Sequence, residues 1–244
     1  MENPVIIALD FENADKAKKF LASFEGQSPY VKVGMELFYA EGPSFVKWLK
    51  DKGFRVFLDL KLHDIPTTVH KAMKVLGGLN IDMVNVHAAG GMVMMKAAKE
   101  GLLASGAHHT KLIAVTQLTS TTEKVLKEEL LIKDTRLKDC VSHYAKLAKD
   151  SGLDGVVCSV QETMEIKNVC GKDFLTVTPG IRPSGSDTHD QARIATPAEA
   201  AAKGSDYMVI GRSITQSEQP LHTYEEILNE WRESHENNNS PTFA

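Results

Sequence analysis

Short β-branched runs alternate with amphipathic stretches along most of the chain. The stretches between the runs carry the mixed polar and apolar spacing of surface helices. Alternation of this kind predicts parallel strands joined by crossover helices. The predicted strands span residues 4–10, 30–35, 54–61, 82–88, 111–118, 155–159, 174–181 and 207–213. The helical patterns lie at 14–24, 42–52, 66–77 and 91–103, and in a mixed segment at 123–150.

Eight strand and helix units favour a closed barrel over an open sheet. A (β/α)8 barrel is typically about 250 residues long, close to the 244 of this chain. An open doubly wound sheet normally carries a glycine-rich fingerprint in its first βα turn, whereas Phe-Glu-Asn-Ala follows Asp10 here. We therefore predict one α/β domain, a (β/α)8 TIM barrel, over residues 1–233. The polar, unpatterned sequence from Ser234 predicts a disordered C-terminal tail over 234–244.

The third predicted strand, FRVFLDLK, separates two kinds of side chain by its alternation. One face carries only aliphatic residues, namely Val56, Leu58, Leu60 and Leu62. The other face ends in Asp59 and Lys61, and in a barrel it points into the lumen near the end where active sites lie. Asp10 and Lys32 occupy inward positions on the first two strands. Because charges are rarely buried unpaired, we expect these two acids and two lysines to neutralise one another in one cavity.

Each of these charges also has an ordinary structural interpretation. Lys32 alone is typical of a surface lysine whose stem covers apolar residues. Asp59 and Lys61 are compatible with a structural ion pair, and Asp64 before Ile65-Pro66 is typical of a helix start. The coincidence of such charges at the ends of three neighbouring strands favours a chemical role.

The last two predicted strands end in residues suited to a phosphate. In (β/α)8 barrels a phosphate commonly lies by the loops after strands seven and eight. Gly211 allows close backbone approach, and Arg212 offers a forked donor that matches phosphate oxygens. Strand seven ends in TPGIRP (178–183) and continues into the polar loop SGSDTHDQAR, which is typical of a lid. An ordinary turn explains Gly211-Arg212 equally well in isolation, but opposite an Asp–Lys cavity the pair indicates an anion site.

The composition argues against several classes of protein. The chain is 42% hydrophobic and 25% charged, as is ordinary for a globular protein, and its net charge of −4 gives no sign of nucleic-acid binding. No apolar run approaches the roughly 18 to 20 residues of a membrane span, and the first residues lack the features of a signal peptide. Three widely spaced cysteines argue against a disulfide framework or a structural zinc site. We expect a cytoplasmic enzyme that binds neither nucleic acid nor membrane.

Together these residues resemble the signature of the orotidine 5′-phosphate decarboxylase family. The pattern Asp-x-Lys-x-x-Asp covers Asp59, Lys61 and Asp64 and continues through Ile65-Pro66 and Thr68. That pattern alone is shared with related sugar-phosphate decarboxylases and aldolases. The resemblance extends over nearly the whole chain apart from the tail, through Asp10, Lys32, Leu-Thr-Ser at 118–120, Thr-Pro-Gly-Ile-Arg at 178–182, Gln191 and Gly211-Arg212.

The resemblance implies a homodimeric enzyme, without cofactor or metal, that converts orotidine monophosphate into UMP and carbon dioxide in de novo pyrimidine synthesis. It implies that Lys61 stabilises and protonates a carbanion at C6 of the pyrimidine, with Asp59, Asp64 and Lys32 completing the catalytic array. It also implies that the segment holding Asp64, Ile65 and Thr68 reaches the partner subunit's site. The other implied substrate contacts are the ribose (Asp10, Lys32), the pyrimidine edge (Thr119), the phosphate (Gln191, Gly211, Arg212) and two less defined positions (Pro179, Arg182).

Three other functions fit part of the same pattern. Sugar-phosphate enzymes of the same suprafamily, such as a 3-keto-gulonate-phosphate decarboxylase or a hexulose-phosphate synthase, use Mg²⁺ and carry an acid where this chain has Lys32. A catalytically silent nucleotide sensor would not need the intact set of Asp59, Lys61 and Asp64. A Schiff-base aldolase needs a neutral lysine, whereas flanking carboxylates keep Lys61 protonated.

The fourth predicted strand also carries polar residues on its inward face. Asn85 and His87 share that face by alternation. We interpret His87 as polar lining or as a structural histidine, and His63 is assigned no role.

Overall fold

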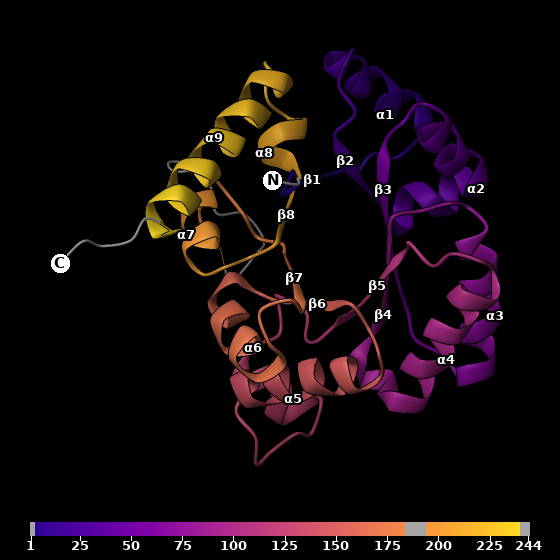
Figure 1. The fold of residues 1–244 in the computed structure, drawn as a ribbon, viewed down its shortest axis with the longest axis vertical. Helices are drawn as coiled ribbons and strands as arrows, with labels where there is room; N and C mark the ends of the chain where they lie inside the picture. The colour runs from indigo at the N-terminus through magenta and orange to yellow at the C-terminus, as the bar shows by residue number, and fades with distance from the viewer. Residues whose placement is uncertain (1–2, 184–193, 240–244) are drawn as a thin grey trace.

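The computed structural model describes residues 3–183 and 194–239, with side chains as far as residue 235. Eight parallel strands close into a barrel in chain order, which confirms the predicted (β/α)8 architecture (Figure 1). All strands therefore end at the same mouth of the barrel. The strands are β1 Val5–Ala8, β2 Tyr30–Gly34, β3 Arg55–Leu62, β4 Met83–His87, β5 Lys111–Val115, β6 Gly155–Val157, β7 Leu175–Thr178 and β8 Tyr207–Ile210.

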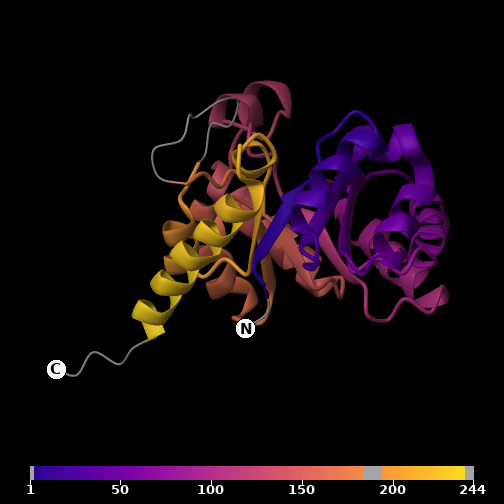
Figure 2. The ribbon, with the colours of Figure 1, turned by 90° about the horizontal axis from the view of Figure 1, so that it is seen from above.

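Helices form the outer layer around the strands. Figure 2 shows the long α9 along the outside of the barrel, with the helices of the first hundred residues on the opposite side. In the part of the chain that the structure describes, none of the helices combines the length and apolar character of a membrane span. The α-helices are α1 Ala14–Leu21, α2 Met35–Asp51, α3 Pro66–Gly77, α4 Gly91–Ala104, α5 Leu137–Asp150, α6 Thr163–Cys170, α7 Pro197–Ala202, α8 Arg212–Thr215 and α9 Pro220–Asn239.

Two helical segments differ from the sequence-based predictions. Helix α2 begins at Met35 rather than near residue 42, and its regular geometry is interrupted at Gly42, where φ is 64°. That left-handed conformation suits glycine, and Pro43 then starts the second part of the helix. Helix α9 extends to Asn239, so residues 234–239 are helical where the sequence predicted a disordered tail. The ring of His235 stacks on buried Trp231 at a centroid distance of 4.7 Å, one turn away, which stabilises this last part of the helix.

The strand alternation read from the sequence matches two separate apolar layers. The larger layer lies between strands and helices and contains Val56, Leu58 and Leu60 of β3. The smaller layer fills the barrel interior and contains Phe57 of the same strand, with Ile6, Tyr30, Met83, Ile113, Val177, Tyr207 and Val209. Side chains thus close the barrel below its carboxyl-terminal mouth, and the polar inward residues lie above this apolar floor.

Strand β3 departs from regular geometry near its carboxyl end. Leu58 pairs with Val84 of β4, but Leu62 pairs with Val86, so the register shifts between these two points. Within this irregular part the backbone of Lys61 has φ 53°, in the left-handed region that side chains rarely adopt. The alternation that placed Lys61 inward does not by itself predict this conformation.

The amino-terminal end of the barrel carries three similar Asp–Lys contacts, which we call the basal clamps. An aspartate just before β4, β6 and β8 accepts the backbone N–H of the preceding strand: Asp82 from Val56 (2.7 Å), Asp154 from Leu112 (2.8 Å) and Asp206 from Thr176 (2.7 Å). The same carboxylate oxygen also forms an ion pair with a lysine. That lysine lies on the helix before the strand that supplies the N–H: Lys50 of α2 before β3, Lys99 of α4 before β5 and Lys167 of α6 before β7. Each clamp therefore fixes two strands and one helix together.

Candidate active site

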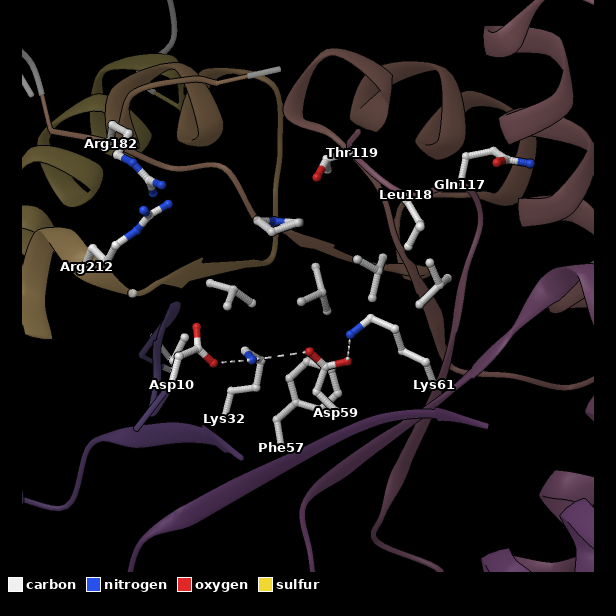
Figure 3. A pocket seen from close by; sticks show the side chains of 17 residues that line it. Asp10, Lys32, Phe57, Asp59, Lys61, Gln117, Leu118, Thr119, Arg182 and Arg212 are labelled. Atoms are coloured by element: carbon white, nitrogen blue, oxygen red, sulfur yellow. Dashed lines mark hydrogen bonds and ion pairs between the residues drawn. The ribbon is translucent and has the colours of Figure 1, made fainter. Parts of the chain in front are cut away.

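A cavity of about 310 Å³ opens at the carboxyl-terminal mouth of the barrel. Its lining draws on seven of the eight strands or the loops that follow them. Figure 3 shows Lys61 on one side, Arg182 and Arg212 on the other, and Asp10, Lys32 and Asp59 between them. The lining residues are Ala8, Asp10, Lys32, Phe57, Asp59, Lys61, Val115, Gln117, Leu118, Thr119, Val157, Val177, Pro179, Arg182, Val209, Gly211 and Arg212.

Four charged side chains alternate in sign along one wall of this cavity, and we call them the charged array. Lys32 Nζ lies 3.1 Å from Asp10 Oδ1 and 3.3 Å from Asp59 Oδ2. The other oxygen of Asp59, Oδ1, accepts from Lys61 Nζ at 2.7 Å (Figure 3). The two acids and two lysines predicted to share a cavity do so, and each lysine has a carboxylate partner.

The centre of the charged array is buried and its ends are not. The side chains of Lys32 and Asp59 are 11% and 12% exposed, whereas those of Lys61 and Asp10 are 26% and 64% exposed. Burial by itself would lower the pKa of Lys32, but the carboxylates of Asp59 and Asp10 outweigh it and raise that pKa. Burial likewise favours a neutral Asp59, yet Lys32, Lys61 and Asn85 lower its pKa overall. The buried pair is therefore ionised at neutral pH.

Local backbone features bring these side chains together. Gly34, directly opposite Asp59 in the register of β2 and β3, leaves room for the array. A Cβ there would lie 3.3 Å from Lys32 Nζ, closer than most such contacts. On β3 the left-handed backbone of Lys61 accompanies the register shift with β4. Asn85 of β4 contacts this region, since its Oδ1 accepts from the Lys61 backbone N–H at 2.8 Å.

The opposite side of the cavity is basic and polar. Arg182, only 7% exposed, follows β7, and its Nη1 donates to the carbonyl of Ile181 at 2.8 Å. Arg212 begins α8 directly after Gly211, and both guanidinium groups extend toward the cavity in Figure 3. Two arginines at one end suit an anion with several oxygens, such as a phosphate.

Part of the cavity lining is apolar. Phe57 and four valines of the later strands, Val115, Val157, Val177 and Val209, line it together with Leu118. Strand alternation would have identified these residues as inward-facing. They were passed over because valine in a buried strand is the most ordinary residue there. An apolar lining lowers the local dielectric and strengthens the interactions of the charges beside it.

Among the described residues, three predicted site residues are not part of this cavity lining. Asp64, Ile65 and Thr68 are exposed at the start of α3, and the Asp64 carboxylate accepts the backbone N–H of Ile65 at 2.6 Å. Gln191 lies outside the described residues. The remaining predicted residues, Asp10, Lys32, Asp59, Lys61, Thr119, Pro179, Arg182, Gly211 and Arg212, all line the cavity.

Two histidines lie close enough to Lys61 for His87 to sense its charge. The rings of His63 and His87 have centroids 5.8 Å apart. Burial, followed by the charges of His63 and Lys61, lowers the pKa of His87, so its ring is neutral at neutral pH. His87 does not line the cavity, which agrees with a structural histidine. Among the described residues, no three His, Cys, Asp or Glu side chains are grouped as a metal site would require.

Comparisons with known proteins agree with one another. The sequence profile of the orotidine 5′-phosphate decarboxylase / HUMPS family matches residues 3–227. An orotidine 5′-phosphate decarboxylase of Bacillus cereus (strain G9842) is 55% identical over 234 residues, which cover 95% of this chain and 98% of the relative. The enzyme of the same name from Bacillus cytotoxicus is 54% identical over the same shares of the two chains.

Solved structures give the same result. The crystal structure of an uncharacterized conserved protein from Geobacillus kaustophilus superposes with a TM-score of 0.84 at 52% identity, covering 93% of this chain and 100% of that one. The crystal structure of orotidine 5′-phosphate decarboxylase from Lactobacillus acidophilus also gives 0.84, at 43% identity, covering 94% of this chain and 99% of that one.

Proposed function

The chain belongs to the orotidine 5′-phosphate decarboxylase / HUMPS family, and we propose that it converts orotidine 5′-phosphate into UMP and carbon dioxide in pyrimidine biosynthesis. The observation that carries the proposal is the arrangement of the cavity. An ionised Asp–Lys array runs along one wall from Lys61 towards two arginines on the other side, and apolar side chains complete the lining. A nucleotide monophosphate has the matching order of parts, with its phosphate at one end and its base at the other.

Loss of carbon dioxide from C6 leaves an electron pair in the plane of the pyrimidine ring. The π system of the ring cannot delocalise that pair, so the enzyme has to stabilise it with a fixed charge. The Lys61 ammonium is the candidate, because it lines the cavity beside the apolar residues and is held by Asp59 at 2.7 Å. It is also placed to deliver the proton that replaces the carboxylate.

Asp59 would hold the Lys61 ammonium in orientation, and Lys32 would hold Asp59 in turn. Asp59 accepts from both lysines through different oxygens, so its carboxylate plane is fixed from two directions. A carboxylate that is already ionised and fixed needs no rearrangement as the carbanion forms. Asp10 and Lys32, nearer the arginine side, are proposed to bind the ribose hydroxyls.

The phosphate would bind between Arg182 and Arg212, with Gly211 allowing close approach of the backbone. In the same orientation Thr119 is proposed to contact the pyrimidine edge and Pro179 to border the base. Gln191, proposed as a further phosphate ligand, lies outside the described residues. Because the phosphate is remote from C6, its binding energy would serve to order the site and would affect kcat as well as KM.

The exposure of Asp64, Ile65 and Thr68 supports the proposal of a homodimer with shared sites. Ile65 is 67% exposed although it is a large apolar residue next to the mouth of the cavity. In a dimer this segment would complete the partner's site, adding a second carboxylate beside the partner's Lys61.

One assay tests the proposed function. Purified protein treated with EDTA should consume orotidine monophosphate, followed by its ultraviolet absorbance, at the same rate as untreated protein. Loss of turnover on chelation, restored by Mg²⁺, would instead favour a metal-dependent sugar-phosphate enzyme of this family. Absence of turnover in both samples, despite tight UMP binding, would favour a nucleotide sensor.

Mixing two inactive variants tests the shared site. Lys61→Ala and Asp64→Ala subunits exchanged into hybrid dimers should recover part of the activity, because one hybrid site then contains both wild-type halves. Subunit exchange is verified with differently tagged proteins, and mixing two batches of Lys61→Ala is the control. No recovery after verified exchange would remove the shared-site proposal and leave the decarboxylase proposal intact.

A further inference from the structure

The position of Lys61 depends on a part of β3 that strand pairing does not hold. The register between β3 and β4 shifts between Leu58 and Leu62, and Lys61 within that interval has φ 53°. For a residue other than glycine, this conformation costs roughly 1 kcal/mol of stability and persists only where neighbouring groups hold it. Lys61 is therefore held by something other than the regular ladder.

Asn85 of β4 makes two hydrogen bonds in this interval. Its Oδ1 accepts from the backbone N–H of Lys61 at 2.8 Å, and its Nδ2 donates to Asp59 Oδ1 at 2.7 Å. That same oxygen of Asp59 accepts from Lys61 Nζ at 2.7 Å. One amide thus binds the backbone of Lys61 and the carboxylate that holds its ammonium.

The surroundings of Asn85 make an amide there unfavourable for stability unless its hydrogen bonds are made. Its side chain is completely buried, and its strand neighbour on the inward face, Met83, belongs to the apolar interior layer. A buried amide is unfavourable compared with an aliphatic side chain unless its hydrogen bonds are made. Asn85 does not line the cavity, so it does not contact the substrate itself.

We propose that Asn85 is a positioning residue for the decarboxylase site, which holds Lys61 and Asp59 in the relative orientation that protonates C6. This inference rests on the proposed function. An amide can perform both tasks because it carries a donor and an acceptor on one rigid plane. An aliphatic residue of similar size has neither group, and an ionised carboxylate has only the acceptor.

Two variants of similar size test the proposal, with kcat, KM and UMP affinity measured across pH. Asn85→Leu should lower kcat by roughly 10- to 100-fold with little change in UMP affinity, as expected when a group that orients a reacting one is lost. Asn85→Asp should be active at low pH and lose activity as pH rises. Its new carboxyl donates to Asp59 only while protonated, and two adjacent carboxyls share a proton to higher pH than one alone.

The control is Thr110→Val, which removes another buried hydrogen bond, from Thr110 Oγ1 to the carbonyl of Ile81 (2.7 Å), at the base of the barrel. It should lower stability without changing kcat or the pH profile. Asn85 would be purely structural if both its variants lost activity by the same factor at every pH, in step with their loss of folded protein.

The proposed function and this inference fail in different ways. Wild-type protein without decarboxylase activity would overturn the function. The carboxyl titration of Asp59, followed by ¹³C NMR, needs no substrate. An unchanged titration in Asn85→Leu would overturn the inference even in an active enzyme, whereas a higher pKa for Asp59 would support it.

Discussion

The two ends of the barrel are both built with Asp–Lys pairs, but the pairs are connected differently. At the amino-terminal end, each basal clamp joins a carboxylate to a backbone N–H and to one lysine on a helix. At the carboxyl-terminal end, Asp59 is bound by three side chains, namely Lys61 of its own strand and Lys32 and Asn85 of the two neighbouring strands. The same chemical groups therefore fix the backbone at one end and fix other side chains at the other.

This difference determines what each end can do. A carboxylate bound to the backbone locks the strand register, and its lysine mainly covers the remaining charge. A carboxylate bound to side chains instead holds a lysine in position at the cavity, as Asp59 holds Lys61. Like other functional sites, the carboxyl-terminal end of the barrel, which we call the upper end, departs from regular geometry, with a left-handed residue and a register shift in β3. We infer that the basal clamps serve stability and the charged array serves chemistry.

The largest effect is expected from an aspartate-to-asparagine change at the upper end. Asp59→Asn removes the charge shared by Lys32 and Lys61, so kcat/KM should fall by about 10³-fold, the size of effect seen when a preorganised charge is lost. Asp82→Asn is the matched change in a basal clamp and should leave kcat/KM within about threefold, since asparagine still accepts the Val56 N–H. Equal losses of activity in the two variants would contradict the assignment of separate roles.

The next largest effect is on stability, at the amino-terminal or lower end of the barrel. Asp206→Ala removes the carboxylate partner of the largely buried Lys167 and the acceptor of the Thr176 N–H. The free energy of unfolding in urea should fall by about 2 to 3 kcal/mol, while kcat of the folded protein stays unchanged. Asp173→Ala, at an exposed position nearby, should change stability by less than about 0.5 kcal/mol. A basal variant as stable as the wild type would show that the clamps do not hold the barrel.

The smallest effect is a pH dependence at the upper end. Burial, His63 and Lys61 lower the pKa of His87 below 6.5, so the unfolded chain binds a proton before the folded protein does. As pH falls from the pKa of the unfolded chain towards the lower pKa of the folded protein, the wild type should lose stability relative to His87→Gln. Above the pKa of the unfolded chain, the difference in unfolding free energy between the two proteins should be constant. Urea unfolding from about pH 7.5 to about pH 5 measures this, with exposed His109→Gln as control. A difference that does not change with pH would mean that the His87 pKa is not lowered.

Much of the fold followed from one pattern in the sequence. Alternation within β3 placed Phe57 and Asp59 inward and Val56 and Leu58 outward, and the two apolar layers confirm this. Boundaries were less predictable, because the chain passes from β2 into α2 at Met35 without a loop. The helix continues past Ser234 with a ring contact between Trp231 and His235, which polar composition does not reveal.

The charged array was predictable from the sequence, but the hydrogen bonds of Asn85 that hold it were not. Four inward charges at the ends of three neighbouring strands indicate one site because parallel strands end at one mouth. The two hydrogen bonds of Asn85 depend on an irregular register of β3, which leaves no periodic signal in the sequence. The basal clamps were missed because a single aspartate before a strand resembles any turn residue.

The most direct test compares one change, lysine to methionine, at the two ends, with kcat/KM and the free energy of unfolding measured on the same preparations. Methionine keeps the apolar stem of lysine and removes the charge. Lys61→Met should lose at least about 10⁴-fold in kcat/KM with a change in stability below about 1 kcal/mol. Lys167→Met should retain kcat/KM within about threefold and lose about 1 to 3 kcal/mol of stability. A Lys61→Met enzyme with near-normal turnover would contradict the separation of chemistry and stability between the two ends.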